Sequence, residues 1–217
     1  ILKDLRARIN SHSPISRLPA EILSEIFLHS FDRPNRESIP PFLPSSTHIQ
    51  DQIDEHIATL LPLTHVCQSW RRVALQFPAL WTDIDCHSRD QYLAFKERSQ
   101  ELGVSLVLGH TAYISNEAVE EVVSSLIHRV QRLDMELECP ELKPPPWIFT
   151  ASAPRMECLN LVIGCDDTQF LGRWRSSPEG RFLFRDEISS LRALSLSGLL
   201  KWIPINSFPN LTHFALS

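Results

Sequence analysis

The amino-acid sequence predicts an α+β fold, in which a helical N-terminal part precedes a region of alternating strands and helices. Three observations lead to this prediction. Apolar residues recur at helical spacing on both sides of a proline-rich segment, short leucine phrases recur in the second half, and charged helix-like segments separate those phrases. The expected parts are residues 1–14 as an N-terminal helix and linker, residues 15–84 as a helical module with an insertion at 31–57, and residues 85–217 as the α/β region.

Composition narrows the class of protein before any motif is considered. The chain has 217 residues, of which 43% are hydrophobic and 22% charged, so it has enough apolar residues for a sizeable core. The net charge of −5 argues against binding to nucleic acid or to an anionic membrane surface. No apolar run approaches the roughly 20 residues that cross a bilayer. Five cysteines without a C-x-x-C pair fit reduced thiols in an intracellular protein, cytoplasmic or nuclear.

Residues 15–30 predict the first helix of the module. Pro19 suits the first turn of a helix, and Glu21 favours its positive N-terminal end. The apolar residues that follow form one stripe, which packs either on the protein's own core or partly on a partner protein. The stripe consists of Ile22, Leu23, Ile26 and Phe27.

The segment 31–57 contains four prolines and many polar residues, and it predicts a surface insertion without regular structure over most of its length. Pro62 then opens a second predicted helix, which ends at Phe77-Pro78 because proline cannot continue a helix. Residues 80–84 alternate like a short strand. The apolar stripe of the second helix consists of Leu63, Val66, Cys67, Trp70, Val73 and Ala74.

The two helical segments on either side of the insertion together resemble the F-box, and in particular fungal F-box-like sequences with a Ser-Pro-Ile lead-in. The resemblance covers about 70 residues, interrupted by the proline-rich insertion. The first half reads LPAEILSEIF and the second reads PLTHVCQSWRRVALQFPALW. The matching residues are Leu18, Pro19, Glu21, Ile22, Leu23, Ile26, Phe27, Val66, Cys67, Trp70, Arg71, Ala74, Leu80 and Trp81.

The resemblance implies a three-helix module that docks onto a Skp-type adaptor, which connects it to a cullin scaffold and a RING-bearing ubiquitin ligase. The chain would then be a substrate receptor that carries no catalytic residue, metal or cofactor of its own. An interaction scaffold without a role in ubiquitination is the alternative. We expect Phe27, Val73 and Ala74 in the core. The docking candidates are Leu18, Pro19, Ile22, Leu23, Ile26, Val66, Cys67 and Trp70.

The second half contains a recurring pattern φ-x-x-φ-x-φ, where φ is an apolar residue. Its fourth positions are Leu133, Leu159, Leu194 and Phe214, so the gaps are 26, 35 and 20 residues. A related phrase occurs at residues 106–108, and helix-like segments are expected at residues 90–102 and 116–130, the latter capped by Ser115 or Asn116. Strands that alternate with helices predict a parallel sheet with right-handed crossovers.

This pattern resembles the irregular leucine-rich repeats that often follow fungal F-boxes, and the gap of 35 residues then requires an insertion, expected at residues 172–182. A small α/β domain without repeats is the alternative. Solenoid repeats present partner-binding surfaces, so the resemblance implies an unknown protein target for residues 85–217. Because the chain begins at Ile1 and ends directly after a strand phrase without a cap, we expect it to be a segment of a longer protein.

The usual motifs of enzymes are missing from the sequence. It contains no P-loop, no G-x-G-x-x-G, no G-x-S-x-G and no H-E-x-x-H. Cys86 and His87 with nearby aspartates imitate a metal site, but a polar loop after a strand explains them better. A stand-alone enzyme is therefore the least favoured of the three functional hypotheses.

Overall fold

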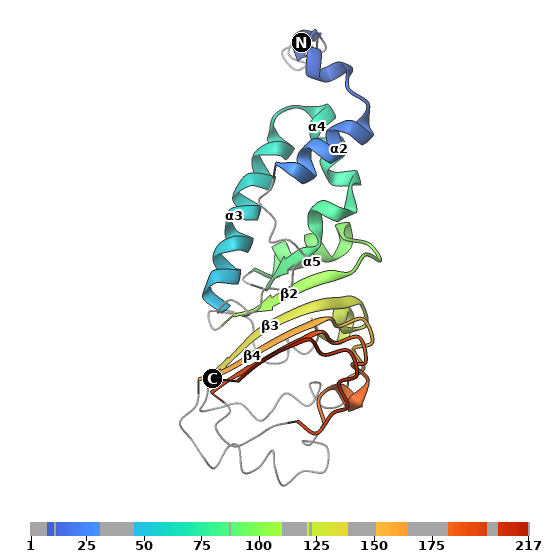
Figure 1. Cartoon of the computed structure of the whole chain (residues 1–217). Helices are drawn as coiled ribbons and strands as arrows, with labels where there is room; N and C mark the ends of the chain where they lie inside the picture. Colours follow the sequence, from blue (N-terminus) through green and yellow to red (C-terminus); the bar gives the residue numbers. More distant parts are fainter. Residues whose placement is uncertain are drawn as a thin grey trace.

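The computed structural model describes residues 8–10, 12–30, 46–86, 88–109, 121, 123–138, 151–164, 182–198 and 204–216. Helices gather at one end of the molecule and a parallel sheet forms the other (Figure 1). Mixed helix and strand content with a parallel sheet agrees with the predicted α+β class.

Three helices form the N-terminal module. They are α2 (Ala20–His29), α3 (Ser46–His65) and α4 (Gln68–Gln76), and both α2 and α3 pack against α4. The short 3-10 helices η1 (Pro14–Arg17) and η2 (Pro78–Trp81) flank them. The helix expected after Pro19 is confirmed, and its first backbone bond runs from the Leu23 amide to the Pro19 carbonyl at 3.1 Å.

Helix α3 corrects the prediction for the insertion. Residues 46–57 are helical, and Pro62 lies inside the helix rather than at its start. The missed signal is a helical period in Ile49, Ile53, Ile57 and Leu60, which lies directly after the prolines. Pro62 is tolerated because it lies within the last turn, where the loss of one backbone hydrogen bond interrupts little of the helix. Residues 31–45, with all four prolines of the insertion, lie outside the described part.

The second predicted helix is in fact two helices. The chain leaves α3 after His65 and starts α4 at Gln68, and Cys67 between them has extended backbone angles of φ −158° and ψ 171°. An extended residue before the first turn is the usual geometry of a helix N-cap. The change of direction lets Trp70 of α4 stack on Phe27 of α2, with ring centroids 5.0 Å apart.

Six parallel strands follow in chain order, each paired with the next, so the predicted parallel sheet is confirmed. β1 lies across the expected boundary at residue 84, which means that the sheet begins within the helical region. The helix α5 (Arg89–Arg98) connects β1 to β2 and confirms most of the helix expected at residues 90–102. The strands are β1 (Asp83–Asp85), β2 (Val104–Leu108), β3 (Val130–Glu138), β4 (Cys158–Gly164), β5 (Ala193–Ser197) and β6 (His213–Leu216).

Shorter helical segments precede two of the strands. Residues 121 and 123–126 are helical and continue into η3 (Ile127–Arg129), after which Val130 begins β3 rather than ending the helix as expected. The 3-10 helix η5 (Phe184–Asp186) precedes β5. The cap expected at Ser115 or Asn116 and most of the insertion expected at residues 172–182 lie outside the described residues.

The register of the sheet reproduces the alignment of the leucine phrases. Leu133 lies opposite Leu159, Leu159 opposite Leu194, and Leu194 opposite Phe214. The same column continues backwards through Leu106 to Ile84. A second column, two residues along, runs through Leu108, Met135, Leu161, Leu196 and Leu216.

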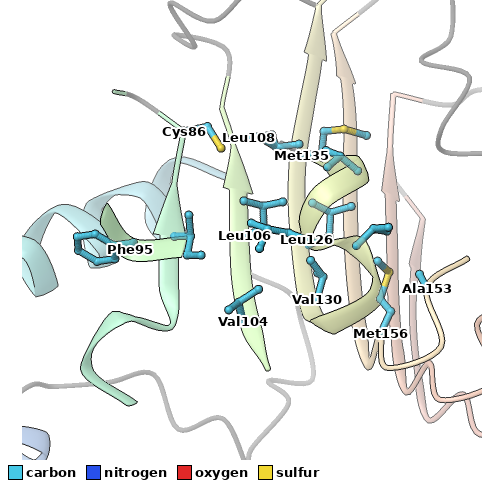
Figure 2. Packing of buried hydrophobic residues seen from close by; sticks show 14 of the residues in the cluster. Cys86, Phe95, Val104, Leu106, Leu108, Leu126, Val130, Met135, Ala153 and Met156 are labelled. Atoms are coloured by element: carbon cyan, nitrogen blue, oxygen red, sulfur yellow. The ribbon is translucent and has the colours of Figure 1, made fainter. Parts of the chain in front are cut away.

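The two columns line the main hydrophobic core. Helix α5 and the helical turn with Leu126 pack on this side of the sheet, and Figure 2 shows Leu126 over the strands that carry Leu106 and Met135. The same cluster includes Leu23 and Phe27 of the module, so the helices and the sheet share one continuous core.

A tight turn recurs before each of the last three strands. Its closing bond joins an apolar residue to another three positions earlier: Met156 N to Ala153 O at 3.1 Å, Leu191 N to Ile188 O at 3.0 Å, and Leu211 N to Phe208 O at 3.3 Å. The same turn followed by a strand therefore occurs three times among the described residues, at 153–164, 188–197 and 208–216.

A buried arginine ties the end of α5 to the start of β3. The Arg129 guanidinium donates to the carbonyls of Lys96 at 3.1 Å and Leu102 at 3.2 Å, to the Ser99 hydroxyl at 3.1 Å, and to the Gln100 carbonyl. The last carbonyls of a helix have no partner within the helix, and a cation placed there satisfies them.

We predict that Leu133→Ala lowers the free energy of unfolding by about 2–5 kcal/mol, because it removes a fully buried side chain from the middle of a column and leaves a cavity. Urea denaturation followed by circular dichroism measures the change. Leu102→Ala, at a position that is 43% exposed, is the control and should change stability far less. Equal effects of the two substitutions would contradict the assignment of the core.

Candidate docking surface

A row of exposed apolar side chains runs along α2 and its lead-in. Leu18, Ile22 and Ile26 are 36%, 48% and 41% exposed, and a spacing of four residues places them on one side of the helix. Pro19, also exposed, lies immediately before the first residue of α2. Apolar side chains left in water at regular spacing are typical of a surface that another protein covers.

The opposite side of α2 faces the core. Leu23 and Phe27 are buried, and the Ser24 hydroxyl turns back to the Ala20 carbonyl at 2.8 Å. The prediction for Phe27, Val73 and Ala74 as core residues is confirmed. Leu23, however, was grouped with the docking candidates, and the structure places it in the core because it lies one position round the helix from the exposed row.

The remaining candidates lie where α3 meets α4. Val66 in this corner is 55% exposed, whereas Cys67 and Trp70 are half-buried. The Trp70 ring packs against Phe27 of α2, so only part of the Trp70 side chain is exposed to a partner. Leu61 on α3 was not among the predicted docking candidates. It is 47% exposed and lies just over one helical turn before Val66. It was missed because the helix was expected to begin at Pro62, the next residue.

Charged side chains border the exposed row. Glu21 and Glu25 project from α2 on one side of it, while Arg71 and Arg72 are exposed on α4. His29 and Glu25 lie 3.9 Å apart, both largely in water, where such a pair contributes little to stability. On α2, exposed apolar side chains thus lie next to exposed charged ones, a mixed composition that is usual in protein–protein interfaces.

The other side of the sheet carries a polar cluster that the sequence analysis did not identify. Arg132 Nε donates to Asp134 Oδ2 at 2.7 Å, and the Asn160 amide also bonds to Asp134. Burial raises the pKa of the Asp134 carboxyl, while Arg132 and Asn160 act in the opposite direction. The register explains the cluster, because Asp134 and Asn160 are direct neighbours across β3 and β4.

Helix α3 covers part of this polar side. It contacts β1, β2 and β3, and Ile57 packs against Val107, which points away from the main core. One residue earlier, His56 Nε2 lies 3.1 Å from the Leu80 carbonyl, so the helix is also fixed to η2. Helix α3 therefore covers part of the polar side of β1, β2 and β3.

The described cysteines differ in accessibility. Burial raises the pKa of Cys158 to about 12 and raises that of Cys86 as well, so both thiols are protonated at neutral pH. Cys67 is half-buried at the corner between α3 and α4 and is not enclosed in the core.

No group of three or more potential metal ligands occurs among the described residues. Among the same residues, no helix has both the length and the apolar character needed to span a bilayer. No protein-family model matches the chain, and no curated protein or solved structure matches it. The class that the structure defines is an α+β protein with a helical module joined to a parallel sheet.

We predict that a maleimide reagent at pH 8 modifies Cys67 faster than Cys86 or Cys158 in the folded protein. Reaction requires an accessible thiolate, and the two strand-associated cysteines are both buried and protonated. Peptide mass spectrometry after timed labelling measures each site separately. In urea the three rates should converge, and slower labelling of Cys67 than of Cys158 in the native protein would contradict the placement.

We also predict that Asp134→Ala destabilises the protein by about 1–3 kcal/mol, because the half-buried Arg132 guanidinium and the buried Asn160 amide lose their shared acceptor. Thermal and urea unfolding measure the loss. Glu187→Ala is the control, since Glu187 is exposed. If the two variants unfold alike, the cluster contributes nothing to the fold.

Proposed function

We propose that this chain is a substrate-receptor subunit of a cullin–RING ubiquitin ligase. Its helical module docks on a Skp-type adaptor, and its sheet region binds a protein target. The proposal combines the resemblance of residues 15–84 to the F-box with one structural observation, the exposed row of Leu18 before α2 and Ile22 and Ile26 on α2. In this role the chain performs no bond chemistry, because it raises the local concentration of a target beside a ubiquitin-loaded partner.

The exposed row supports docking better than the alternative that the helices pack only on themselves. The core of the module already contains Leu23, Phe27, Leu60 and Ala74, all buried. Ile22 and Ile26 remain 48% and 41% exposed, and covering them with a partner would remove this apolar surface from water. Full burial of an exposed isoleucine is worth about 1.5–3 kcal/mol, so each of these half-exposed side chains would contribute roughly half of that.

The leucine-rich-repeat interpretation of the sheet region belongs to the same proposal. Six parallel strands in chain order and a recurring turn–strand unit are features of a solenoid, in which each repeat packs on its neighbours. In such a fold the exposed strand faces and loops bind partners. Because α3 covers part of the polar side over β1 to β3, and Cys158 and Asn160 on that side of β4 are buried, we propose that the target-binding surface lies towards β5 and β6.

We predict that the double substitution of Ile22→Asp and Ile26→Asp abolishes binding to a Skp-type adaptor while the protein stays folded. Two carboxylates would be buried at the interface without partners, so affinity should fall by at least about 100-fold. Co-purification and titration calorimetry measure the loss, with circular dichroism as the test of folding. Leu93→Asp is the matched control, because Leu93 is similarly exposed but lies on α5.

Unchanged binding by the doubly substituted protein would place docking elsewhere and remove the support for the proposal. Leu23→Asp is unsuitable for this purpose, since it introduces a charge into the core. If the adaptor binds but the reconstituted ligase transfers no ubiquitin to any candidate target, the chain acts as an interaction scaffold instead.

A further inference from the structure

The turn η5, which precedes β5, has a strained backbone. Phe184, Arg185 and Asp186 have φ angles of 50°, 56° and 65°, so three consecutive residues lie in the left-handed region. This region is unfavourable for any residue with a Cβ atom, most of all for a bulky one such as phenylalanine, and it is usually occupied by single residues. A run of three without a glycine therefore persists only where neighbouring groups hold it in place.

Burial restrains one end of this turn. The side chains of Leu183 and Phe184 are fully buried in the main hydrophobic core. Two backbone bonds close the turn, from Asp186 N to Leu183 O at 3.0 Å and from Glu187 N to Phe184 O at 2.8 Å. Arg185, Asp186 and Glu187 are exposed, so the packing of their side chains does not explain the left-handed backbone there.

Asn206, which lies ahead of β6, binds the turn from the next part of the chain. Its Oδ1 accepts from the Leu183 amide at 2.7 Å, and its Nδ2 donates to the Leu183 carbonyl at 2.7 Å. The following residue adds a bond from Ser207 N to Asp186 Oδ1 at 2.9 Å. A side-chain amide that satisfies both backbone groups of one residue pairs with it as a neighbouring strand would. We name the two bonds between Asn206 and Leu183 the Asn206 clamp.

Residues 204–216 carry β6, and their pairing with β5 is short. The register joins four residues of each strand. Outside the strand pairing, Asn210 Nδ2 donates to the Ser189 carbonyl at 2.7 Å, and the Thr212 hydroxyl donates to the Arg192 carbonyl at 3.0 Å. The Asn206 clamp differs from these bonds because it makes two contacts and ends on the strained turn. Opening the clamp therefore frees the segment before β6 and removes a restraint on the turn.

We propose that the Asn206 clamp is a conformational device that controls local opening of residues 204–216. In the closed state the clamp holds the turn in its left-handed conformation and β6 on β5. In the open state the turn relaxes to ordinary backbone angles, and residues 204–216 separate from β5 while the rest of the sheet stays folded. Strain in the turn favours opening and the clamp opposes it, so the balance between them sets how often the segment opens.

The clamp also bears on target binding, and this consequence rests on the proposed function. The proposed target-binding surface lies towards β5 and β6, so opening would withdraw β6 from it. Asn206 would then be a positioning residue for that surface, because it acts through the turn and not by contact with the target. The experiments below use neither adaptor nor target, so their failure is distinguishable from failure of the proposed function.

Amide hydrogen exchange in β6 measures how often the segment opens. Asn206→Ala removes both bonds of the clamp, and we expect exchange in β6 to accelerate by at least about tenfold while β2 and β3 are unchanged. Asn210→Ala is the matched control, because Asn210 lies in the same segment but bonds to Ser189 and not to the turn, and its effect should be smaller. Equal acceleration by the two variants, or acceleration of β2 and β3 along with β6, would overturn the proposal.

Substitution by glycine tests the strain on the same amides. Arg185→Gly removes the Cβ atom from a residue at φ 56°, so the closed turn is less strained, and exchange in β6 should slow by about two- to fivefold. Glu187→Gly is the control, since Glu187 is also exposed but has a φ of −95°, where glycine only adds freedom to the open chain. Exchange in β6 should then be unchanged or faster. If both substitutions act alike, strain does not drive opening and the proposal is wrong.

Asn206→Asp distinguishes the hydrogen bonds of the clamp from simple packing. The ionised carboxylate still accepts from the Leu183 amide, but it places a negative oxygen against the Leu183 carbonyl, so exchange in β6 should accelerate at neutral pH. That carbonyl and the nearby Asp186 carboxylate both raise the pKa of the new carboxyl above its unfolded value. Stability is therefore regained as the pH falls, when the protonated carboxyl donates the missing bond.

The measured quantity is the exchange rate in β6 of the Asn206→Asp protein divided by that of the original chain at the same pH. We expect this ratio to decrease towards one between about pH 7 and about pH 4. A ratio that stays constant over this range would show that no donor to the Leu183 carbonyl is needed, and it would overturn the role of the clamp.

Discussion

The parallel register of the sheet is the constraint on which the rest of the structure depends. Each strand from β2 to β6 places apolar residues at two alternate positions, and parallel pairing aligns them into two columns, one of which continues to Ile84 in β1. The register shifts once, between Val104 and Ser105 at the start of β2, before either column begins. A shift by one residue in any strand would exchange this set for polar neighbours such as Asp134 and Asn160. The core, the position of α5 and the polar cluster on the opposite side all follow from that alignment.

Helix α3 joins the two parts of the molecule. It packs on α4 at one end of its length and on β1, β2 and β3 at the other (Figure 1). Leu60 lies in the main core, and Ile57 contacts both the core and Val107 on the polar side. The proposed docking face is therefore held at a defined position relative to the sheet. In a substrate receptor this arrangement would set the distance between the adaptor and the bound target.

Several features of the site were predictable because they depend on local spacing. The helical period of residues 22–27 identified α2, and the φ-x-x-φ-x-φ phrases identified four strands together with their alignment. Other features depend on packing between distant segments. The helical spacing of apolar residues in α3 was overlooked because it directly follows a segment rich in prolines. Leu23 and Ile22 are adjacent apolar residues of one stripe, so spacing alone does not show which of them is buried. Only the position of α4, with Trp70 against Phe27, decides which of them faces inward.

The sequence by itself determined the helical and strand periods, the repeated unit and its alignment, because these follow from the spacing of apolar residues along the chain. Tertiary structure alone decided two things. It split the second stripe at Cys67, and it placed α3 on the polar side of the sheet. The physical reason is that burial depends on which surfaces meet, and for residues such as Ile57 and Trp70 those surfaces belong to segments far apart in the chain.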